Sequence, residues 1–241
     1  MIIPYANNTA SGTYSAMILK RVNAPIRDQA LKHIRGAIVG GQFNPGERLS
    51  ERKLCEFIGA SRTTIREVLR HLESEGLIKV IPQKGPIVAT ITGEEGKSIY
   101  EVREVLEGLV CRLFAERASS NAIVALRRSL ALLERHVKEG DLASQLTESN
   151  KFYEILMEEC GNKVVCSLLK SLHARISFLR RMSLSHKGRP LRSVKELRAI
   201  YEAIEKGDAD AAWETSTYHV REAKSRALQY LNSSSKKDLT P

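Results

Sequence analysis

Residues 45–91 constrain the fold more than any other part of the chain, because helical and strand patterns follow one another there at short spacing. In residues 49–58 apolar side chains recur at helical spacing after Ser50, a favourable N-cap residue. Gly59 interrupts this helix, and Ser61 can cap a second helix whose apolar side chains also share one face. Two short helices joined by so tight a turn are typical of a helix-turn-helix motif.

The N-terminal end of the second helix carries basic and hydroxyl side chains opposite its apolar face. These side chains are Arg62, Thr63, Thr64 and Arg66. A helix that buries one side and presents arginine and threonine at its leading end fits the major groove of DNA. The sequence therefore predicts a DNA-binding protein.

The surrounding segments complete a small domain. Residues 77–81 and 87–91 are rich in β-branched side chains, and residues 82–86, with two prolines and a glycine, join them as a hairpin tip. Residues 26–39 form an amphipathic helical pattern that can pack behind the two short helices. We expect a winged helix-turn-helix domain over residues 24–92.

The second half of the chain shows helical periodicity and no strand pattern. The breaks fall at Ser119, Gly140, Gly161, Gly188 and Gly207. About six helices over residues 94–231 are therefore expected. The predicted fold is mainly α: an N-terminal winged helix-turn-helix followed by an all-α six-helix bundle that serves as effector domain. Residues 1–23 are expected to form a flexible arm, and residues 232–241 a disordered tail.

Composition limits the class of partner and the compartment. Lys and Arg number 38 against 28 Asp and Glu, so the formal net charge is +10 and a polyanionic partner is favoured. The chain has four cysteines, and none of them belongs to a CxxC motif. They are expected to be buried free thiols: Cys55, Cys111, Cys160 and Cys166. The sequence contains no apolar run of about 18 residues and no signal-peptide pattern at its start. We expect a cytoplasmic protein that does not enter a membrane.

Residues 24–91 resemble the DNA-binding domain of the GntR family of bacterial transcription regulators. The resemblance includes the pattern Arg-Thr-x-x-Arg-Glu-x-Leu over residues 62–69. It implies that Arg52, Arg62 and Arg66 meet double-stranded DNA, and the two arginines of the second helix can each contact the O6/N7 edge of guanine.

The resemblance extends these expectations to the neighbouring groups. Ser61, Thr63 and Thr64 would donate to phosphates or touch base edges. Lys84 and Gly85 would bring the wing into the minor groove. The alternative is that these side chains are ordinary solvated surface groups.

Residues 94–230 resemble the FCD ligand-binding domain, which accompanies the FadR branch of the same family. The resemblance rests on Tyr100-x-x-Arg103-x-x-Leu106-Glu107, on Phe152-x-x-x-Leu156 with Gly161-Asn162, and on Ala203-Ile204-x-x-Gly207-Asp208-x-x-x-Ala212 followed by His219. Six helices are more similar to the VanR-like subgroup than to the fatty-acyl-responsive one.

Most domains of this kind hold a divalent metal through an Asp, a His four residues later and two further His. The corresponding positions here are Ser149, Tyr153, Leu197 and His219. Only His219 offers a donor suited to such a site. We therefore expect the usual metal site to be lost, with no cofactor.

Without a metal, side chains must supply the positive charge that holds a small organic acid effector. Arg103 and Arg175 are the expected carboxylate ligands, because arginine can bind a carboxylate bidentately. Ser149, Tyr153 and His219 are the expected hydrogen-bonding residues of the pocket.

Each effector residue has an alternative. Arg103 can instead form a salt bridge with Glu107 or Glu101 on a solvated face. Arg175 can be a surface residue, as its charged neighbours at 180 and 181 suggest. His219 can be a satisfied core residue, and Tyr153, a phenol on an apolar helix face, can be an ordinary core residue.

The resulting expectation is a homodimeric, ligand-responsive transcription regulator. Two winged domains would read a pseudo-palindromic operator, and a small organic acid would release repression. An enzyme is disfavoured for two reasons. The sequence shows no nucleophile, general base and orienting residue at a spacing typical of a catalytic site, and it has no phosphate-binding glycine loop. The other alternative is a non-specific nucleic-acid-binding protein, whose affinity would depend on salt and little on sequence.

Overall fold

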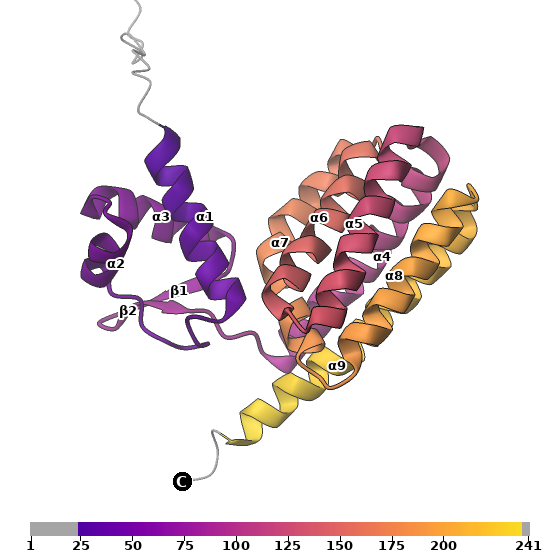
Figure 1. The fold of residues 1–241 in the computed structure, drawn as a ribbon. Helices are drawn as coiled ribbons and strands as arrows, with labels where there is room; N and C mark the ends of the chain where they lie inside the picture. Colours follow the sequence, from indigo (N-terminus) through magenta and orange to yellow (C-terminus); the bar gives the residue numbers. More distant parts are fainter. Residues whose placement is uncertain (1–23, 238–241) are drawn as a thin grey trace, which may run out of the picture.

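The structure is a computed structural model that describes residues 24–237. The expected N-terminal arm, residues 1–23, lies outside the described residues. Two domains follow each other along the chain, a small one with a hairpin and a larger bundle of helices (Figure 1). The small domain contains α1 (Ala24–Gly40), α2 (Glu51–Ile58), α3 (Arg62–Ser74), β1 (Ile78–Ile81) and β2 (Gly85–Val88).

Local capping explains where the two short helices begin. The Ser50 hydroxyl accepts a hydrogen bond from the Lys53 backbone N–H, and the Ser61 hydroxyl accepts one from the Thr64 backbone N–H. Between the helices Gly59 adopts a left-handed conformation with φ 71°, which glycine tolerates without a Cβ clash. The helix-turn-helix predicted from the sequence is confirmed in this detail.

The hairpin is short and antiparallel. Ile78 pairs with Val88, and Arg48 forms an isolated bridge with Ile87 on the other side of β2. The second strand therefore begins at Gly85 and ends at Val88, earlier than the segment 87–91 predicted from β-branched content. A hairpin beside a helix-turn-helix makes the small domain a winged helix, as expected.

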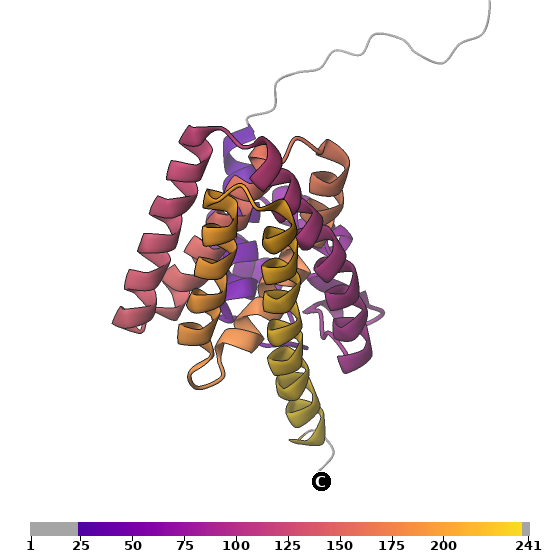
Figure 2. The ribbon, with the colours of Figure 1, turned by 90° about the vertical axis from the view of Figure 1, so that its right-hand side faces the viewer.

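The larger domain consists entirely of helices among the described residues. They are α4 (Gly93–Arg117), α5 (Ser120–Glu139), α6 (Leu142–Glu159), α7 (Lys163–Leu184), α8 (Arg189–Glu205) and α9 (Ala209–Lys237). The six helices and the breaks between them agree with the prediction, and α4 packs along α9 (Figure 2). Helix α9 continues to Lys237, which corrects the disordered tail predicted from residue 232, while residues 238–241 lie outside the described part. None of the described helices has the length and apolar character needed to cross a membrane.

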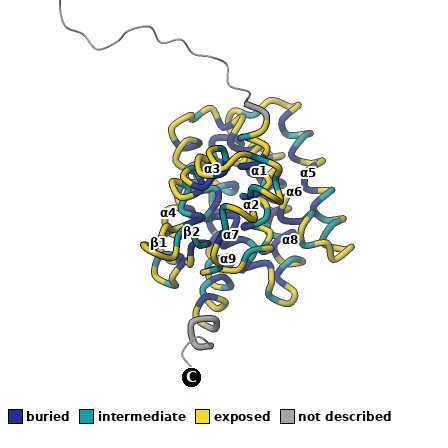
Figure 3. The backbone as a smooth tube through the Cα atoms, turned by 90° about the vertical axis from the view of Figure 1, so that its left-hand side faces the viewer, coloured by how far each residue is buried: buried dark blue, intermediate teal, exposed yellow. Residues whose placement is uncertain are grey.

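Helix α7 connects the two domains. Figure 3 views the molecule from the winged domain, with α7 behind it. Ala174 of α7 belongs to the same buried apolar cluster as Ile34 and Ile38 of α1. The Arg181 guanidinium group lies beside Gly41, and the φ of 78° at Gly41 favours glycine there. The winged domain thus packs against one face of α7.

His173 lies at this junction and predicts a pH dependence of stability. Burial, followed by the positive charges of Arg180 and Arg35, lowers the pKa of His173 to about 4, while Glu75 and Glu107 act in the opposite direction. In the unfolded chain the ring titrates near 6.5. Between these values the unfolded state binds more protons, so stability falls as the pH decreases from 6.5 towards 4.

We expect His173→Gln to remove a destabilisation of about 2 kcal/mol that the unaltered protein suffers between pH 7 and pH 5. Urea unfolding of both proteins at the two pH values measures this difference. Equal pH dependence in the two proteins would show that the His173 ring is protonated in the folded state at pH 5.

Candidate functional site

Three elements of the winged domain meet at one concave surface. The N-terminal ends of α2 and α3 and the C-terminal arm of the hairpin form a groove of ≈ 410 Å³. Its lining consists of Arg48, Leu49, Ser50, Glu51, Arg52, Arg62, Gly85 and Pro86. The structure therefore brings together the predicted residues Arg52, Arg62 and Gly85. A groove with three arginines and a single carboxylate is suited to a phosphate backbone.

Two arginines at this surface, Arg52 and Arg66, form ion pairs with nearby carboxylates. The Arg66 Nε donates to Glu51 at 2.9 Å, and the Arg52 Nη1 donates to Glu56 at 3.4 Å. Exposed ion pairs of this kind contribute little to stability, so both arginines can exchange their partner for a nucleic acid at small cost. Arg62 is exposed at the first position of α3.

The hydroxyl groups at the start of α3 have structural partners as well as exposure. The Ser61 and Thr64 hydroxyls lie 2.9 Å apart, and the Ser61 hydroxyl also accepts the Thr64 N–H. Thr63 is exposed beside them. These three residues form the capped N-terminus of the helix, where backbone N–H groups favour an anion such as phosphate.

The tip of the hairpin requires unusual backbone conformations. Gln83 has φ 65° and Gly85 has φ 80°, both in the left-handed region, and Lys84 between them is exposed. Arg48, which the sequence interpretation missed, lies next to this tip through its bridge to Ile87. Its only sequence signal was its position two residues before the Ser50 cap.

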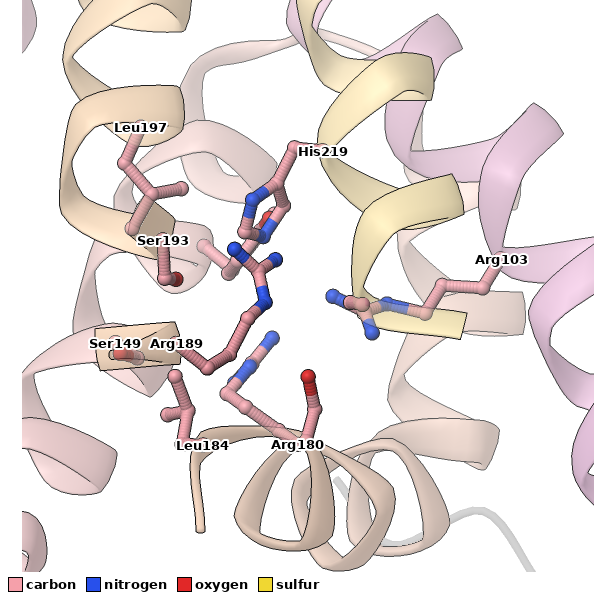
Figure 4. A pocket seen from close by; sticks show the side chains of 11 residues that line it. Arg103, Ser149, Arg180, Leu184, Arg189, Ser193, Leu197 and His219 are labelled. Carbon is pink, nitrogen blue, oxygen red and sulfur yellow. The ribbon is translucent and has the colours of Figure 1, made fainter. Parts of the chain in front are cut away.

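The helical domain contains a second candidate site, a small cavity at its centre. Its lining consists of Arg103, Ser149, Tyr153, Arg180, Ser183, Leu184, Arg189, Ser193, Leu197, His219 and Ala223. Its volume is ≈ 10 Å³, about the space that one water molecule needs. Three arginine side chains and His219 point into it from different helices (Figure 4).

Arg103 enters the cavity from α4 together with a carboxylate. Its Nε and Nη2 donate to the two oxygens of Glu107 at 2.6 and 3.2 Å, and both residues are almost fully buried, at 1% and 3% exposure. Burial alone lowers the pKa of Arg103, but the charge of Glu107, helped by Tyr100 and Tyr153, outweighs this and raises it. The guanidinium group is therefore a permanent positive charge in the interior.

Arg180 enters from α7 without a carboxylate. Among the described residues it forms no ion pair; its Nη1 donates to the Asn150 Oδ1, and its guanidinium lies 4.7 Å from the centroid of the Tyr153 ring. Burial, followed by repulsion from Arg103, lowers the pKa of Arg180. A buried cation whose best partners are an amide oxygen and an aromatic face is incompletely neutralised.

Arg189 and His219 share the second carboxylate of the site. Both terminal nitrogens of Arg189 donate to Glu196 at 2.7 Å, and His219 Nδ1 lies 2.7 Å from the same carboxylate. Burial lowers the pKa of His219 more than Glu196 raises it, and Arg103 lowers it further. The ring is therefore neutral near pH 7 and donates its Nδ1–H to Glu196, which makes Nε2 an acceptor.

Several buried polar atoms of the cavity have no hydrogen-bond partner among the described residues. They are Arg103 Nη1, Tyr153 Oη, Ser183 Oγ and Arg189 Nε. Unsatisfied buried donors are costly and rare in folded proteins. Three buried arginine charges against the carboxylates of Glu107 and Glu196 leave one positive charge in excess. The cavity is chemically complementary to a small anion with further hydrogen-bonding groups.

The residues present do not fit a metal ion. The four positions that correspond to metal ligands, Ser149, Tyr153, Leu197 and His219, do line one cavity. They offer a hydroxyl, a phenol whose pKa burial raises well above its ordinary value, a hydrocarbon and one imidazole. Within the described residues no group of three or more His, Cys, Asp or Glu side chains is arranged to hold a metal.

The structure corrects one predicted effector residue. Arg175 lies at the domain junction rather than in the cavity: its side chain packs against Gly76 before β1, and its Nη1 lies 3.8 Å from Glu95 of α4. Five residues separate it from Arg180, a rotation of about 140° around the helix, so the two point to different faces. Arg180, which the sequence suggested to be exposed, is the cavity arginine of α7.

The predicted residues Arg103, Ser149, Tyr153 and His219 are brought together. The pairing of Arg103 with Glu107 considered from the sequence also exists, but it is buried instead of solvated. Glu101, the other partner considered, binds Lys224 at 3.2 Å. Arg180 and Arg189 were missed, because an arginine at a buried position has the same sequence pattern as one on a solvated face.

Comparison with known proteins agrees with this division of the chain. Residues 26–88 match the bacterial regulatory proteins of the gntR family, and residues 98–222 match the FCD domain. The HTH-type transcriptional regulator YdhC of Bacillus subtilis is 30% identical over 185 residues, covering 76% of this chain and 83% of YdhC. The HTH-type transcriptional repressor RspR of Escherichia coli is 25% identical over 198 residues, covering 82% and 87%.

Solved structures show the same fold. Escherichia coli McbR/YncC aligns with a TM-score of 0.76 at 18% identity, covering 85% of this chain and 97% of that one. A GntR-type chain from Rhodococcus sp. RHA1 aligns with a TM-score of 0.72 at 22% identity, covering 84% and 97%. Families and relatives are transcriptional regulators, which confirms that the chain is not an enzyme. This chain belongs to the GntR family of bacterial transcriptional regulators and carries an FCD domain behind its winged helix-turn-helix.

Proposed function

We propose that this regulator binds a pseudo-palindromic operator as a homodimer and that a small organic acid, bound in the central cavity, releases it from the DNA. The effector assignment rests on the excess positive charge of the cavity. Two of the N–H groups that carry this charge, Arg103 Nη1 and Arg189 Nε, have no hydrogen-bond partner among the described residues. Repression is supported by the printed name of the relative RspR, a transcriptional repressor.

The DNA part of the proposal rests on the groove of the winged domain. Arg62 and Arg66 lie one turn apart at the exposed start of α3, a spacing at which each can meet a guanine in the major groove. Arg48 and Arg52 lie beside them and would contact the backbone. Lys84 at the hairpin tip would enter the adjacent minor groove.

The effector part names a class of ligand. One excess positive charge matches one carboxylate, and the hydroxyls of Ser149, Ser183, Ser193 and Tyr153 can bond oxygen atoms on the rest of the molecule. The ligand would therefore be a hydroxylated monocarboxylic acid. Since the cavity is only ≈ 10 Å³, its entry requires the lining side chains to move apart.

Selection of duplexes from a random pool, followed by fluorescence anisotropy, tests this function. We expect a selected duplex to bind at least about a thousandfold more tightly than an unrelated duplex at physiological salt. A panel of sodium salts, including acetate, lactate, gluconate and glucuronate, is then titrated into the complex, and at least one hydroxy acid should release the DNA. Nearly equal affinity for all duplexes, governed by salt alone, would point to the non-specific alternative.

A metal-independent pocket is a separate prediction. We expect native mass spectrometry with elemental analysis to find a dimer without stoichiometric metal, both before and after treatment with a chelator. The reason is the donor set, in which only His219 of the four corresponding positions is a good ligand for zinc or nickel. One zinc or nickel per chain would contradict the assignment and require other donors.

A further inference from the structure

Asn150 links the effector cavity to the junction between the domains. Its side-chain Oδ1 accepts hydrogen bonds from the Arg180 Nη1 and, at 3.1 Å, from the Ser177 hydroxyl. Arg180 lines the cavity. Asn150 and Ser177 line a different space, a groove of ≈ 770 Å³ between α6 and α7 on one side and α1 of the winged domain on the other. One amide oxygen therefore ties the cavity arginine to the wall of the interdomain groove.

The segment of α7 that carries Arg180 also contacts the winged domain. Ala174 packs into the core of that domain, and Arg181, the next residue after Arg180, lies against Gly41 at the end of α1. Ser177 lies one turn after Ala174 on the same helix. A change in how α6 holds α7 at Asn150 would therefore act directly beneath α1.

The bond between Arg180 and Asn150 is the one that an acid in the cavity would displace. The Arg180–Asn150 bond joins a cation to a neutral amide oxygen, whereas a carboxylate carries the opposite charge and can accept two parallel N–H bonds from one guanidinium group, so it is the stronger partner. Arg103 and Arg189 already have carboxylate partners, Glu107 and Glu196. Arg180 is thus the cavity arginine with most to gain from an incoming carboxylate.

From these contacts we infer that Asn150 is the positioning residue that couples the cavity to the winged domain. This inference rests on the proposed function and deepens it. A carboxylate in the cavity draws Arg180 away from Asn150. Helix α6 then loses one of the two hydrogen bonds by which Asn150 holds α7. The part of α7 that packs against α1 shifts as a result. The bound acid then favours a different placement of the winged domains, and operator affinity changes through that differential preference.

The test is a double-mutant cycle that needs no identified effector. Operator affinity of the full-length protein is measured on the selected duplex for Asn150→Ala, Arg180→Met and the double variant. Both single changes break the same bond, one from the groove side and one from the cavity side. We expect each to shift the operator Kd in the same direction by about fivefold or more, and the double variant to shift it no further than the larger single change.

Two further variants exclude a merely structural effect. Asn150→Asp has almost the same shape and gives Arg180 a charged partner, so the bond is kept and operator affinity should stay within about twofold of the unaltered protein. Thr147→Ala is the matched control, because Thr147 lines the same groove from α6 and its hydroxyl donates to the Ala143 carbonyl of its own helix, with no hydrogen bond to α7 among the described residues. It should leave the operator Kd unchanged.

The outcomes separate the coupling role from the proposed function. Additive effects of Asn150→Ala and Arg180→Met, or unchanged affinity in both, would overturn the coupling role while the protein still prefers its selected duplex. Loss of affinity in Asn150→Asp equal to that in Asn150→Ala would overturn it as well. Absence of any preferred duplex for the unaltered protein would remove the proposed function, and the coupling role with it. Thermal unfolding of every variant identifies a folding defect, and the Asn150→Asp result then decides.

Discussion

Replacing Arg62 by alanine is expected to weaken binding to the selected operator by roughly ten- to a hundredfold for each half-site, because a bidentate arginine–guanine contact contributes about 1–3 kcal/mol of discrimination. Arg62 is the first residue of α3 and lies in the groove shared with Arg48, Arg52 and the hairpin tip. Its replacement would remove the proposed base contact without disturbing the buried face of the helix. Fluorescence anisotropy with the selected and an unrelated duplex measures the change.

The matched control for this variant is Arg70→Ala. Arg70 is exposed on the same helix, but it lies two turns beyond Arg62, away from the leading end. It should lose little specific affinity, and native mass spectrometry should find the same dimer for both variants. Specific binding retained by Arg62→Ala at the strength of the unaltered protein would contradict the proposed mode of DNA recognition.

Replacing Glu107 by glutamine is expected to cost about 3–5 kcal/mol of unfolding free energy, because it leaves buried positive charge without its partner. Glutamine has almost the same shape as glutamate, so the loss reports charge and not packing. Arg103 would keep at most one hydrogen bond, to the glutamine carbonyl oxygen, and the repulsion between Arg103 and Arg180 would be left unopposed at this side of the cavity. Urea unfolding measures the difference.

Glu101→Gln is the matched control on the same helix. Glu101 pairs with Lys224 at an exposed site, so its replacement should cost at most about 1 kcal/mol. The double variant Arg103→Met with Glu107→Met should recover much of the stability that Glu107→Gln loses, since apolar side chains of similar volume often replace a buried pair without loss. Equal losses of unfolding free energy for Glu101→Gln and Glu107→Gln would show that the Glu107→Gln variant does not leave Arg103 as an unpaired buried charge.

The two predictions concern two halves of one mechanism. The winged domain presents exposed arginines that can exchange their carboxylate partners for DNA, whereas the cavity holds buried arginines. The charge excess in the cavity is a standing cost to the folded protein, which a bound acid would remove. An effector that neutralises it therefore has free energy available to shift the winged domains.

Local sequence patterns determined the helices and their order. Ser50, Ser61 and the breaks at Gly140 and Gly207 act within a few residues, through caps and left-handed turns that depend little on the rest of the fold. The winged helix and the six-helix bundle were therefore predictable. The end of α9 was not, because a polar segment continues a helix readily when the helix before it is anchored by packing.

The cavity was only partly predictable for the same kind of reason. Arg103 and Glu107 are four residues apart, so the helix alone places them side by side, but burial depends on which helices cover that face. Arg175 and Arg180 stand on one helix with similar sequence surroundings, and only the packing of α7 between the bundle and the winged domain decides which one faces the cavity.

The sequence by itself determined the winged helix, the helical bundle and the basic start of α3, because each depends on residue type at short spacing. Only the tertiary structure decided that Arg103, Arg180 and Arg189 share one cavity with fewer carboxylates than cations. It also decided that Asn150 stands between that cavity and the winged domain. The physical reason is that charge balance and coupling arise between residues far apart in sequence, which meet only when the helices are packed.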